Sequence, residues 1–395
     1  MGKPAKKINR SSSQDDGSEM TNFSSVKAKE RLDQSQLMTY LDAGVRNNEE
    51  LELKSVLQLI KSTFTFRKET GLPVLDLGYF ANVINVGHNL GIAISTDGVG
   101  TKILIAEMLG KYDTIGIDCI AMNVNDVICV GAEPTTMVDY IAVEEARPEL
   151  LKEIAKGLVE GAHISNINIP AGEIAQVPEL IKGYSRGSGC DVVGTCIGLV
   201  DLDKIIVGQN LQAGDVVIGI ASSGVHSNGL TLARKALLEK GKYNVDTFVP
   251  ELGRTIGEEL LKPTHIYVRE VMELIKSGLS IKALVHITSD GFLNLARIDN
   301  NLGYVIESLP DPQPIFNIIQ RAGIIANEEM FRVFNMGIGF CVVLEPKDVD
   351  RAISIIKKHG VEATQIGHVI DDPERRVQIL PYNLIGEGDH FLSRD

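Results

Sequence analysis

The sequence predicts a mixed α+β or α/β fold in two domains. Short apolar runs of strand length alternate with helical stretches along most of the chain. Glycine-containing turns repeatedly join a strand to a helix, and 38 of the 395 residues are glycine, which indicates many tight turns. The turn-rich segment 201–215 separates two halves that both show this alternation. We therefore place the two domains at residues 37–205 and 206–395.

In the first half, apolar residues spaced three and four apart predict an amphipathic helix over residues 48–64. The other elements expected there are strands at 91–95, 137–143 and 192–199, and helices from Lys102 and over 114–130 and 148–163. The elements expected in the second half are strands at 215–221, 283–288 and 338–344, and helices over 229–240, 264–276 and 346–358 and from Phe292. No short repeat is present, which argues against a solenoid.

The charge balance is not that of a nucleic-acid-binding protein. Lys and Arg number 39 against 52 Asp and Glu, which gives a formal net charge of −13. We therefore expect no nucleic-acid partner and no membrane partner, and any anion site has to be built locally from backbone N–H groups, a few cations or a metal. No run approaches the ~18 apolar residues of a membrane helix. The first ten residues are polar and basic, without the apolar core of a secretory leader, so we predict a cytoplasmic location.

Two features are expected to lie outside any site. Residues 1–36 lack the apolar surface needed to offset ordering entropy, so they are predicted to form a disordered polar tail, with a docking segment as the alternative. The five cysteines form no CxxC pair and are odd in number. They are expected to be small buried apolar residues in a reducing compartment, and a thiol nucleophile is the alternative.

The first candidate site is the turn TDGVGTK at residues 96–102, between a strand and a helix. Gly98 and Gly100 let the backbone approach a ligand closely, and the helix N-terminus adds partial positive charge that favours a phosphate. Asp97 could hold a metal ion that bridges phosphate oxygens. The segment is not a Walker A loop, because the GxxxxGK[ST] pattern is absent. An ordinary glycine-rich turn with a Thr cap is the alternative.

The second candidate site lies on the expected helix 114–130. Apolar residues cover most of its circumference, and Asp118, Asn125 and Asp126 occupy the remaining arc. Burying carboxylates costs several kcal/mol unless they are paired or bind a metal, which argues for a ligand at this arc. Asp97 and Asp126 together would supply two oxygen ligands to a Mg²⁺ ion that carries a nucleoside triphosphate. A solvated polar stripe is the alternative.

The third candidate site is the loop ASSGVHSNG at residues 221–229, which follows a strand. His226 can exchange protons near neutral pH. Ser223, Ser227 and Asn228 can form hydrogen bonds to a polar substrate or a phosphate. A turn that caps the next helix is the alternative. A serine hydrolase is disfavoured because GxSxG is absent.

Three further segments place polar residues at turns. Residues 286–291, HITSDG, repeat the strand–turn–helix layout of the first site, although His286 could equally be a strand histidine. Residues 335–339 bring glycines into a strand, where a structural role is at least as plausible. Residues 171–178 form a turn-rich segment with one carboxylate, Glu173.

These motifs occur in a fixed order along the chain. They read TDGVGTK, IDCIAMNVNDVICVGAEP, CDVVGTCIGLV, SSGVHSNG, LKPTHIY, HITSDGFLNL and FNMGIG, and YLDAGV precedes them at residues 40–45. The ordered set closely resembles the phosphoribosylformylglycinamidine cyclo-ligase family, also called the aminoimidazole ribonucleotide synthetase family, over residues 40–380. The DG turns and the NxND helix also occur in its wider superfamily, which includes formylglycinamidine ribonucleotide synthetase, selenophosphate synthetase and thiamine-monophosphate kinase.

The resemblance implies an ATP-dependent ring closure. Formylglycinamidine ribonucleotide would become aminoimidazole ribonucleotide, with release of ADP and phosphate, through phosphorylation of the formamide oxygen. The implied fold has an N-terminal mixed domain, a half-barrel that pairs with its mate in a homodimer, and a C-terminal α/β domain. The active site would lie in the cleft between the domains.

The resemblance also implies a role for each candidate residue. A Mg²⁺ ion, brought with ATP, would bind to Asp97 and Asp126. The ATP-binding residues would be Asp97, Gly98, Gly100, Thr101, Lys102, Asn125 and Glu173. The substrate-binding residues would be Ser223, His226, Ser227, Asn228, His286, Thr288 and Asp290. The catalytic residues would be His226, Asp126 and Lys102.

Two segments depart from the family pattern. The glycine-rich loop GGxGGFG, which is thought to cover the nucleotide, is replaced by LPVLDLGYFA at residues 72–81. The motif GGETAEMPG is replaced by AGEIAQVPE at residues 171–179. These changes leave two alternatives open: another ATP-dependent phosphoryl-transfer enzyme of the superfamily, or a catalytically weak nucleotide-binding regulator.

Overall fold

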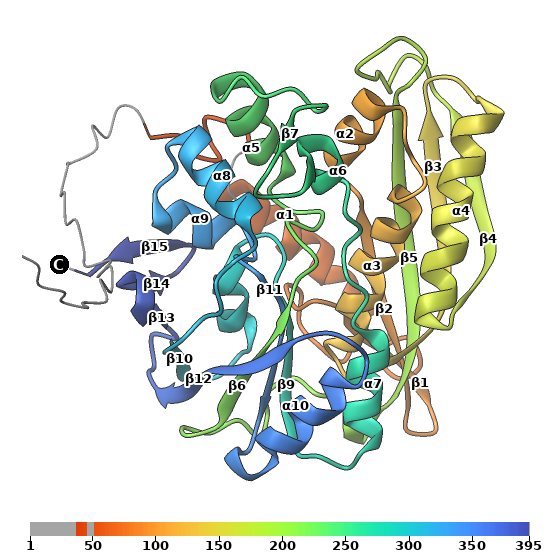
Figure 1. Cartoon of the computed structure of the whole chain (residues 1–395). Helices are drawn as coiled ribbons and strands as arrows, with labels where there is room; N and C mark the ends of the chain where they lie inside the picture. Colours follow the sequence, from red (N-terminus) through yellow and green to blue (C-terminus); the bar gives the residue numbers. More distant parts are fainter. Residues whose placement is uncertain (1–36, 46–50, 395) are drawn as a thin grey trace, which may run out of the picture. The chain divides into compact units, whose positions relative to one another are not determined.

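Two β-sheets organise the computed structural model, which describes residues 37–45 and 51–394 and the side chains of 37–45 and 55–394 (Figure 1). The strands between residues 82 and 201 form the first sheet, and those between 216 and 393 form the second. The predicted disordered tail, 1–36, and the first three residues of the predicted helix 48–64 lie outside the described residues. The remainder of that prediction corresponds to α1 (Leu51–Lys61), followed by a short 3-10 helix.

The first sheet has five strands in the order β1-β2-β5-β3-β4. Their bounds are β1 (Asn82–Gly87), β2 (Leu90–Gly98), β3 (Glu133–Val143), β4 (Asn168–Gln176) and β5 (Cys190–Asp201). All neighbours are antiparallel except β3 and β4, so the sheet is mixed, as the sequence predicts. Alternate residues of β5 are buried, which is the pattern of a sheet with one covered face.

Helices cover that face. α2 (Lys102–Leu109) follows β2, and α3 (Ile115–Ile128) packs against β2 and β5. α4 (Pro148–Ser165) crosses α3 at close range, because a Cβ atom on Gly116 would lie 2.1 Å from the backbone nitrogen of Leu158. Glycine at position 116 therefore allows the two helices to approach this closely, and any larger residue there would force them apart. The buried apolar face of α3 lies between this contact and the sheet.

The second sheet has eight strands in the order β15-β14-β13-β10-β12-β6-β11-β9. Their bounds are β6 (Val216–Ala221), β9 (Ile281–His286), β10 (Leu302–Ile306), β11 (Ile338–Leu344), β12 (Ala363–Asp371), β13 (Val377–Ile379), β14 (Leu384–Glu387) and β15 (His390–Ser393). Central strands β6 and β11 are apolar and almost wholly buried, as expected for strands covered on both faces. Only β10 and β13 pair in parallel among these strands.

The helices of the second half complete the core. They are α5 (Leu230–Arg234), α6 (Ile256–Leu260), α7 (Val268–Lys276), α8 (Pro314–Gly323), α9 (Asn327–Val333) and α10 (Val349–Lys357). α7 and α10 pack against each other, and α10 also contacts β6 and β12. A small hairpin, β7 (Phe248–Val249) with β8 (Arg254–Thr255), precedes α6.

The structure differs from the predicted helix 264–276, which begins only at Val268. The cause lies at the start of the predicted helix, where the backbone N–H groups of Thr264 and Tyr267 donate to the side chains of Asp118 and Asn125 on α3. These residues are held by α3 and do not form a helical turn. The predicted helix 229–240 is α5 followed by a π-helical turn over Lys235–Lys240. Both differences depend on tertiary contacts, which the local spacing of apolar residues does not determine.

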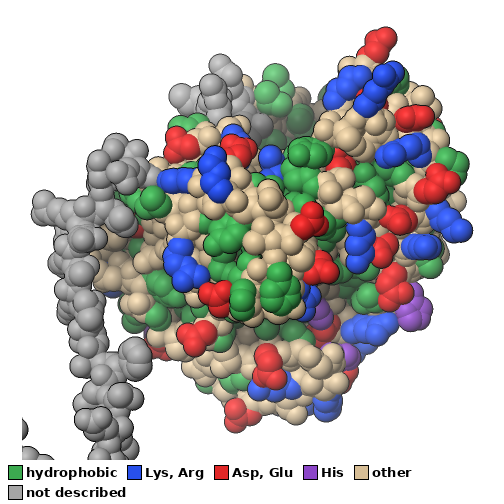
Figure 2. Space-filling model, turned by 45° about the horizontal axis from the view of Figure 1, so that its top comes forward, with side chains coloured by type: hydrophobic (Ala, Val, Ile, Leu, Met, Phe, Trp, Pro, Cys, Tyr) green, Lys and Arg blue, Asp and Glu red, His purple; other side chains and the backbone are tan. Residues whose placement is uncertain are grey.

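All five cysteines are buried, as expected, and burial raises the pKa of the Cys196 thiol to about 12. Among the helices of the described chain, none combines the length and apolar character needed to span a bilayer. Figure 2 shows basic and acidic side chains interspersed on one face of the molecule, with apolar side chains between them.

Candidate active site

Asp97 and Asp126 lie close enough at one end of the first sheet for the charge of Asp126 to act on Asp97. Asp97 lies at the end of β2, and Asp126 lies in the last turn of α3. Asn123, one turn earlier on α3, binds the backbone of Asp97 twice: it accepts from the N–H at 2.9 Å and donates to the carbonyl at 3.0 Å. Burial and the nearby carboxylate of Asp126 raise the pKa of Asp97 from 3.8 to about 6. Two carboxylates from separate segments are therefore neighbours, and their binding of one metal ion stays a prediction.

A histidine of the second sheet joins these carboxylates. His286 is the last residue of β9, and its Nδ1 lies 2.9 Å from Oδ1 of Asp126. Its other nitrogen, Nε2, lies 3.5 Å from the amide nitrogen of Asn125. The two halves of the chain therefore meet directly at the predicted metal ligand.

His226 is the next candidate residue of the site, after the carboxylate pair and His286. It follows β6 and is only 3 % exposed, with the positive φ of 65° that non-glycine residues rarely adopt. Its Nε2 accepts a hydrogen bond from the backbone N–H of Ser223 at 3.1 Å. Burial, helped by the positive charge of Lys102 and the nearby rings of His286 and His265, lowers the pKa of His226 well below 6.5. The ring is therefore neutral near pH 7, and because Nε2 accepts, the proton lies on Nδ1.

Neighbouring side chains support the loop that carries His226. Asn335 donates to the carbonyl oxygens of Gly224 and Val225, at 2.9 and 3.2 Å. Tyr267 donates through its hydroxyl to the carbonyl of Ala221 at 2.9 Å. Nδ1 of His226 is buried and has no hydrogen-bond partner among the described residues. A buried donor left unpaired is costly, so this nitrogen is a candidate to donate to a bound ligand.

Gly339 lies beneath this ring. A Cβ atom on it would lie 2.0 Å from the Tyr267 hydroxyl and 2.6 Å from Cε1 of His226. The glycine-rich segment 335–339, for which the sequence favoured a structural role at least equally, thus leaves the space that the imidazole occupies.

Comparison with known proteins identifies the family. A family model described as "AIR synthase related protein, N-terminal domain" matches residues 78–200, and its C-terminal counterpart matches residues 212–380. A protein of Methanocaldococcus jannaschii named phosphoribosylformylglycinamidine cyclo-ligase is 45% identical over 340 residues, which cover 86% of this chain and 94% of that protein. The chain belongs to the phosphoribosylformylglycinamidine cyclo-ligase family. A relative of the same name from Thermococcus kodakarensis is 46% identical over 87% of this chain and 98% of its own.

Solved structures support the fold at lower similarity. A chain in the crystal structure of a HypE–HypF complex has a TM-score of 0.57 at 21% identity, over 85% of this chain and 99% of its own. A thiamine-monophosphate kinase from Stenotrophomonas maltophilia has a TM-score of 0.54 at 18% identity, over 84% and 96%. The family models and the relatives confirm the predicted family, and these solved structures support its two-domain mixed α/β fold. The relatives are named as ligases, the enzyme class that the sequence indicated.

Two residues to which the family resemblance assigns ATP contacts are occupied by protein contacts. Lys102 is wholly buried, and its ammonium lies 2.8 Å from Oδ1 of Asp118. Asn125 accepts from the N–H of Tyr267 and donates to the carbonyl of His265, both at 2.9 Å. Oδ1 of Asp118 therefore has its partners within the protein, whereas Oδ2 is buried without a hydrogen-bond partner among the described residues. The ATP contacts of Lys102 and Asn125 remain predictions.

Other predicted residues lie farther from the carboxylate pair. Glu173 is on β4, the far edge strand, where it pairs with Tyr140. Tyr140 and Glu173 point to the exposed face of the sheet, whereas α3 covers the other face. Within one protomer the structure does not bring Glu173 together with Asp97 and Asp126, and its ATP contact stays a prediction.

Asp290 lines a cavity beside the carboxylate pair. The cavity has a volume of about 1120 Å³, and its walls include the altered loop 74–79, Asp290 and Arg297. Arg297 binds Asp290 at 3.0 Å and lies 5.2 Å from the ring centre of Phe80. A smaller cavity of about 180 Å³ shares residues 76–79 and reaches Asp126. The loop that replaces the glycine-rich family motif therefore borders the space next to the predicted metal ligand.

Three further residues predicted to bind substrate are Thr288, Asn228 and Ser227. Thr288 is 7 % exposed in the turn after β9. Asn228 lies 3.9 Å from the sulfur of Met122. Ser227 donates to Asp118 at 3.2 Å. Their substrate contacts stay predictions, and Ser227 has a protein partner that the sequence did not suggest.

The donor set fits a Mg²⁺ ion that arrives with a nucleotide. In the described chain, no group of three or more His, Cys, Asp or Glu side chains could hold a metal alone. Mg²⁺ commonly binds to one or two carboxylates and completes its octahedron with phosphate oxygens and water. Burial and, to a smaller extent, the charge of Asp126 raise the pKa of Asp97, and a divalent cation would relieve the repulsion between the two carboxylates.

Proposed function

We propose that this protein closes the imidazole ring of aminoimidazole ribonucleotide from formylglycinamidine ribonucleotide, with ATP converted to ADP and phosphate. One observation carries the proposal: Asp97 and Asp126 converge next to His286, while His226 presents an unpaired nitrogen from a neighbouring loop. The identity of 45% to a named cyclo-ligase supports this choice over other members of the superfamily.

The proposed chemistry overcomes a poor leaving group. The γ-phosphoryl group of ATP passes to the formamide oxygen, the amidine nitrogen then attacks that carbon and loses a proton, and the carbon–oxygen bond breaks to release phosphate. A bound Mg²⁺ would supply charge neutralisation to the phosphates. Gly98 and Gly100 leave room for the phosphates beside the first turn of α2, and Asp97 and Asp126 fix where the charge is neutralised.

His226 would act as a hydrogen-bond donor to the reacting group. Its neutral ring carries the proton on Nδ1. Because the loop already holds the ring in place, donation to an oxygen on which negative charge develops would require no rearrangement of the protein. His286 would hold Asp126 in position through the bond between Nδ1 and the carboxylate. The two halves of the chain thus contribute separate functions, charge neutralisation and donation, to one site.

A coupled assay tests the proposal. The purified chain is given MgATP with and without formylglycinamidine ribonucleotide, ADP is measured continuously, and the aminoimidazole product is detected by diazo coupling. We expect ADP release only with the ribonucleotide and one product per ADP. Turnover of ATP that ignores the ribonucleotide would favour another phosphoryl-transfer enzyme. Binding of MgATP without turnover would favour the regulator.

We also propose that residues 37–205 form the nucleotide-binding half and that its sheet pairs with a second copy of the chain. The uncovered face of the first sheet carries exposed apolar side chains: Val138, Tyr140 and Leu199 are 36 %, 42 % and 42 % exposed. Adjacent exposed apolar side chains of this kind mark an interface more often than a free surface. The resemblance implies a half-barrel that is completed by an identical half, and this face has the matching character.

Replacing Val138 and Tyr140 together by lysine should break such a dimer, because each interface would then bury four ammonium groups. Sedimentation velocity is expected to shift from twice the chain mass to 42.9 kDa. Phe248→Lys is the matched control, since Phe248 is 61 % exposed on the hairpin β7–β8 of the second half and should leave the dimer intact. A wild-type chain that stays monomeric at micromolar concentration would contradict the proposal.

A further inference from the structure

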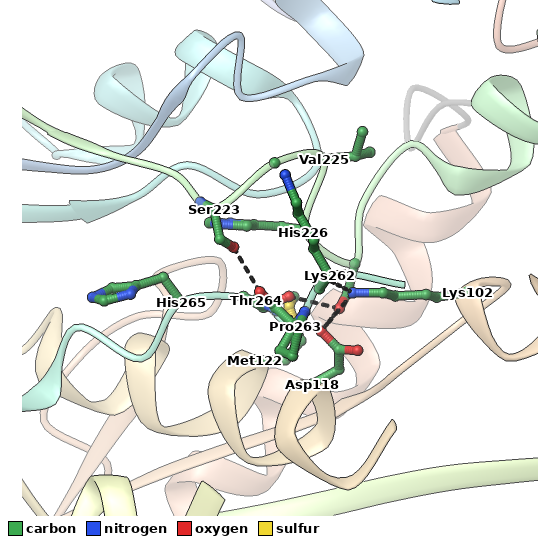
Figure 3. A network of polar contacts seen from close by, with 12 residues as sticks. Lys102, Asp118, Met122, Ser223, Val225, His226, Lys262, Pro263, Thr264 and His265 are labelled. Carbon is green, nitrogen blue, oxygen red and sulfur yellow. Dashed lines mark hydrogen bonds and ion pairs between the residues drawn. The ribbon is translucent and has the colours of Figure 1, made fainter. Parts of the chain in front are cut away.

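Three segments from the two halves of the chain meet at one buried oxygen atom (Figure 3). Oδ1 of Asp118 accepts from the ammonium of Lys102 at 2.8 Å, from the backbone N–H of Thr264 at 2.7 Å and from the hydroxyl of Ser227 at 3.2 Å. Asp118 and Lys102 are both 0 % exposed. Lys102 also donates to the carbonyl of Lys262 at 2.5 Å.

These segments include the parts that carry the proposed chemistry. Lys102 directly follows the glycine turn 98–101, and Ser227 directly follows His226. Thr264 belongs to segment 262–267. In the same segment, the carbonyl of Pro263 accepts a hydrogen bond from the hydroxyl of Ser223 at 2.6 Å. The loop before and after His226 is thus tied to the same segment that Asp118 holds.

Asp118 lies on the stripe of α3 that faces this loop. Asp118, Met122 and Asn125 are spaced i, i+4, i+7, which places them on one side of the helix. Met122 contacts Asn228, and Asn125 binds the segment 262–267 at two further backbone groups. One side of α3 therefore binds both the His226 loop and segment 262–267, and the same helix carries Asp126 in its last turn, about 12 Å farther along.

We infer that Asp118 is a positioning residue of the active site, which fixes the distance between the His226 loop and the carboxylates of Asp97 and Asp126 by joining Lys102, Ser227 and Thr264 at one oxygen. A simple stabilising pair would not need to connect three chain segments at the site. Because the ammonium of Lys102 is in this contact, its effect on the reaction is exerted through Asp118. The inference rests on the proposed function only for its activity readout.

The Asp118→Asn variant tests it. Asparagine keeps the shape and one oxygen acceptor but removes the charge that holds Lys102. We expect kcat to fall by about 10- to 100-fold, the loss that a misplacement of about 1 Å produces, while the KM for ATP changes by less than about threefold. Amide hydrogen exchange should quicken in segments 222–229 and 262–267, which is a readout independent of activity.

A second buried ion pair supplies the matched control. Lys282 and Asp215 lie 2.7 Å apart with side chains 5 % and 1 % exposed, at the end of β6 opposite to the His226 loop. Asp215→Asn should lower the unfolding temperature about as much as Asp118→Asn, yet leave kcat within about twofold and the exchange of 222–229 unchanged. This separates a loss of stability from a loss of positioning.

A double-mutant cycle with Ser227→Ala tests whether Asp118 affects kcat through its contact with Ser227. If Asp118 acts through Ser227, the double variant should be little slower than Asp118→Asn alone. Effects that multiply, or full kcat in a folded Asp118→Asn protein, would overturn the inference. If Asp118→Asn does not fold, Thr264→Pro takes its place with the same expected fall in kcat, since it removes the backbone donor to Asp118 together with the hydroxyl that lies 2.9 Å from Oγ of Ser227. A wild-type chain without ring-closing activity would defeat the proposed function, whereas the exchange data would still test the positioning.

Discussion

Replacing His226 by asparagine should lower kcat for ring closure by about 10²- to 10⁴-fold, the range found for a side chain that donates or moves a proton at the reacting group. Asparagine is the suitable replacement, because it tolerates the positive φ of 65° at this position better than alanine does. The loss should appear in kcat more than in the KM for ATP, since the proposed role of the ring is to donate to the reacting group and the carboxylates that would hold MgATP are untouched.

The pH profile gives this prediction a sharper form. Burial lowers the pKa of His226 well below 6.5, so the ring stays neutral from pH 6.5 to 8. The rate should therefore show no ionisation of His226 in that interval, in contrast to a general base with an ordinary imidazole pKa. His163→Asn, at an exposed position in the last turn of α4, is the matched control and should keep kcat within about twofold. Near-normal turnover of His226→Asn would remove the residue from the reaction.

The sequence predicted the elements that local periodicity determines. β3 and β11 are strands where apolar runs indicated them, and α3 is a helix buried around most of its circumference, as expected. It did not predict the edge strands β1 and β4, the interior strands β10 and β12, or the short strands β13 to β15 near the sheet edge. The apolar run of β10 is short, and polar residues interrupt that of β12. Edge strands lack the continuous apolar run or the strict alternation on which such predictions depend.

At the site, sequence order was enough to predict the convergence of Asp97 and Asp126, because carboxylates at the ends of a buried strand and a buried helix need a common partner. The partner of Asp118 could not be predicted, since Lys102 is 16 residues away and nothing in its spacing distinguishes an ion pair from a phosphate contact. Asn123 was also missed. Its signal was a polar residue at a position of α3 that the helical stripe makes wholly buried.

The largest opposed effects on stability and activity are expected for Asp97→Asn. In the metal-free protein, the variant should be more stable than wild type by about 1–2 kcal/mol at pH 8, because burial and Asp126 disfavour the charged carboxylate. The folded pKa of about 6 lies above the unfolded value of 3.8, so this penalty is complete above pH 6 and declines as the pH falls toward 3.8. Differential scanning calorimetry in EDTA should show a melting temperature higher by about 2–4 °C at pH 8, and no difference near pH 4.

Activity should move in the opposite direction, with kcat/KM for MgATP lower by about 10²- to 10³-fold, because one of the two carboxylates that would neutralise the phosphates is gone. Mg²⁺ with ADP should raise the melting temperature of wild type but not of Asp97→Asn, since only a ligand that binds the folded state stabilises it. Asp201→Asn, on the exposed end of β5, is the control and should alter neither quantity beyond about 0.5 kcal/mol or twofold. A variant that is less stable in EDTA, or that retains MgATP turnover, would show that the two carboxylates do not share a cation. An increase in stability together with a loss of turnover is the pattern expected when two like charges are held together for a ligand and not for the fold.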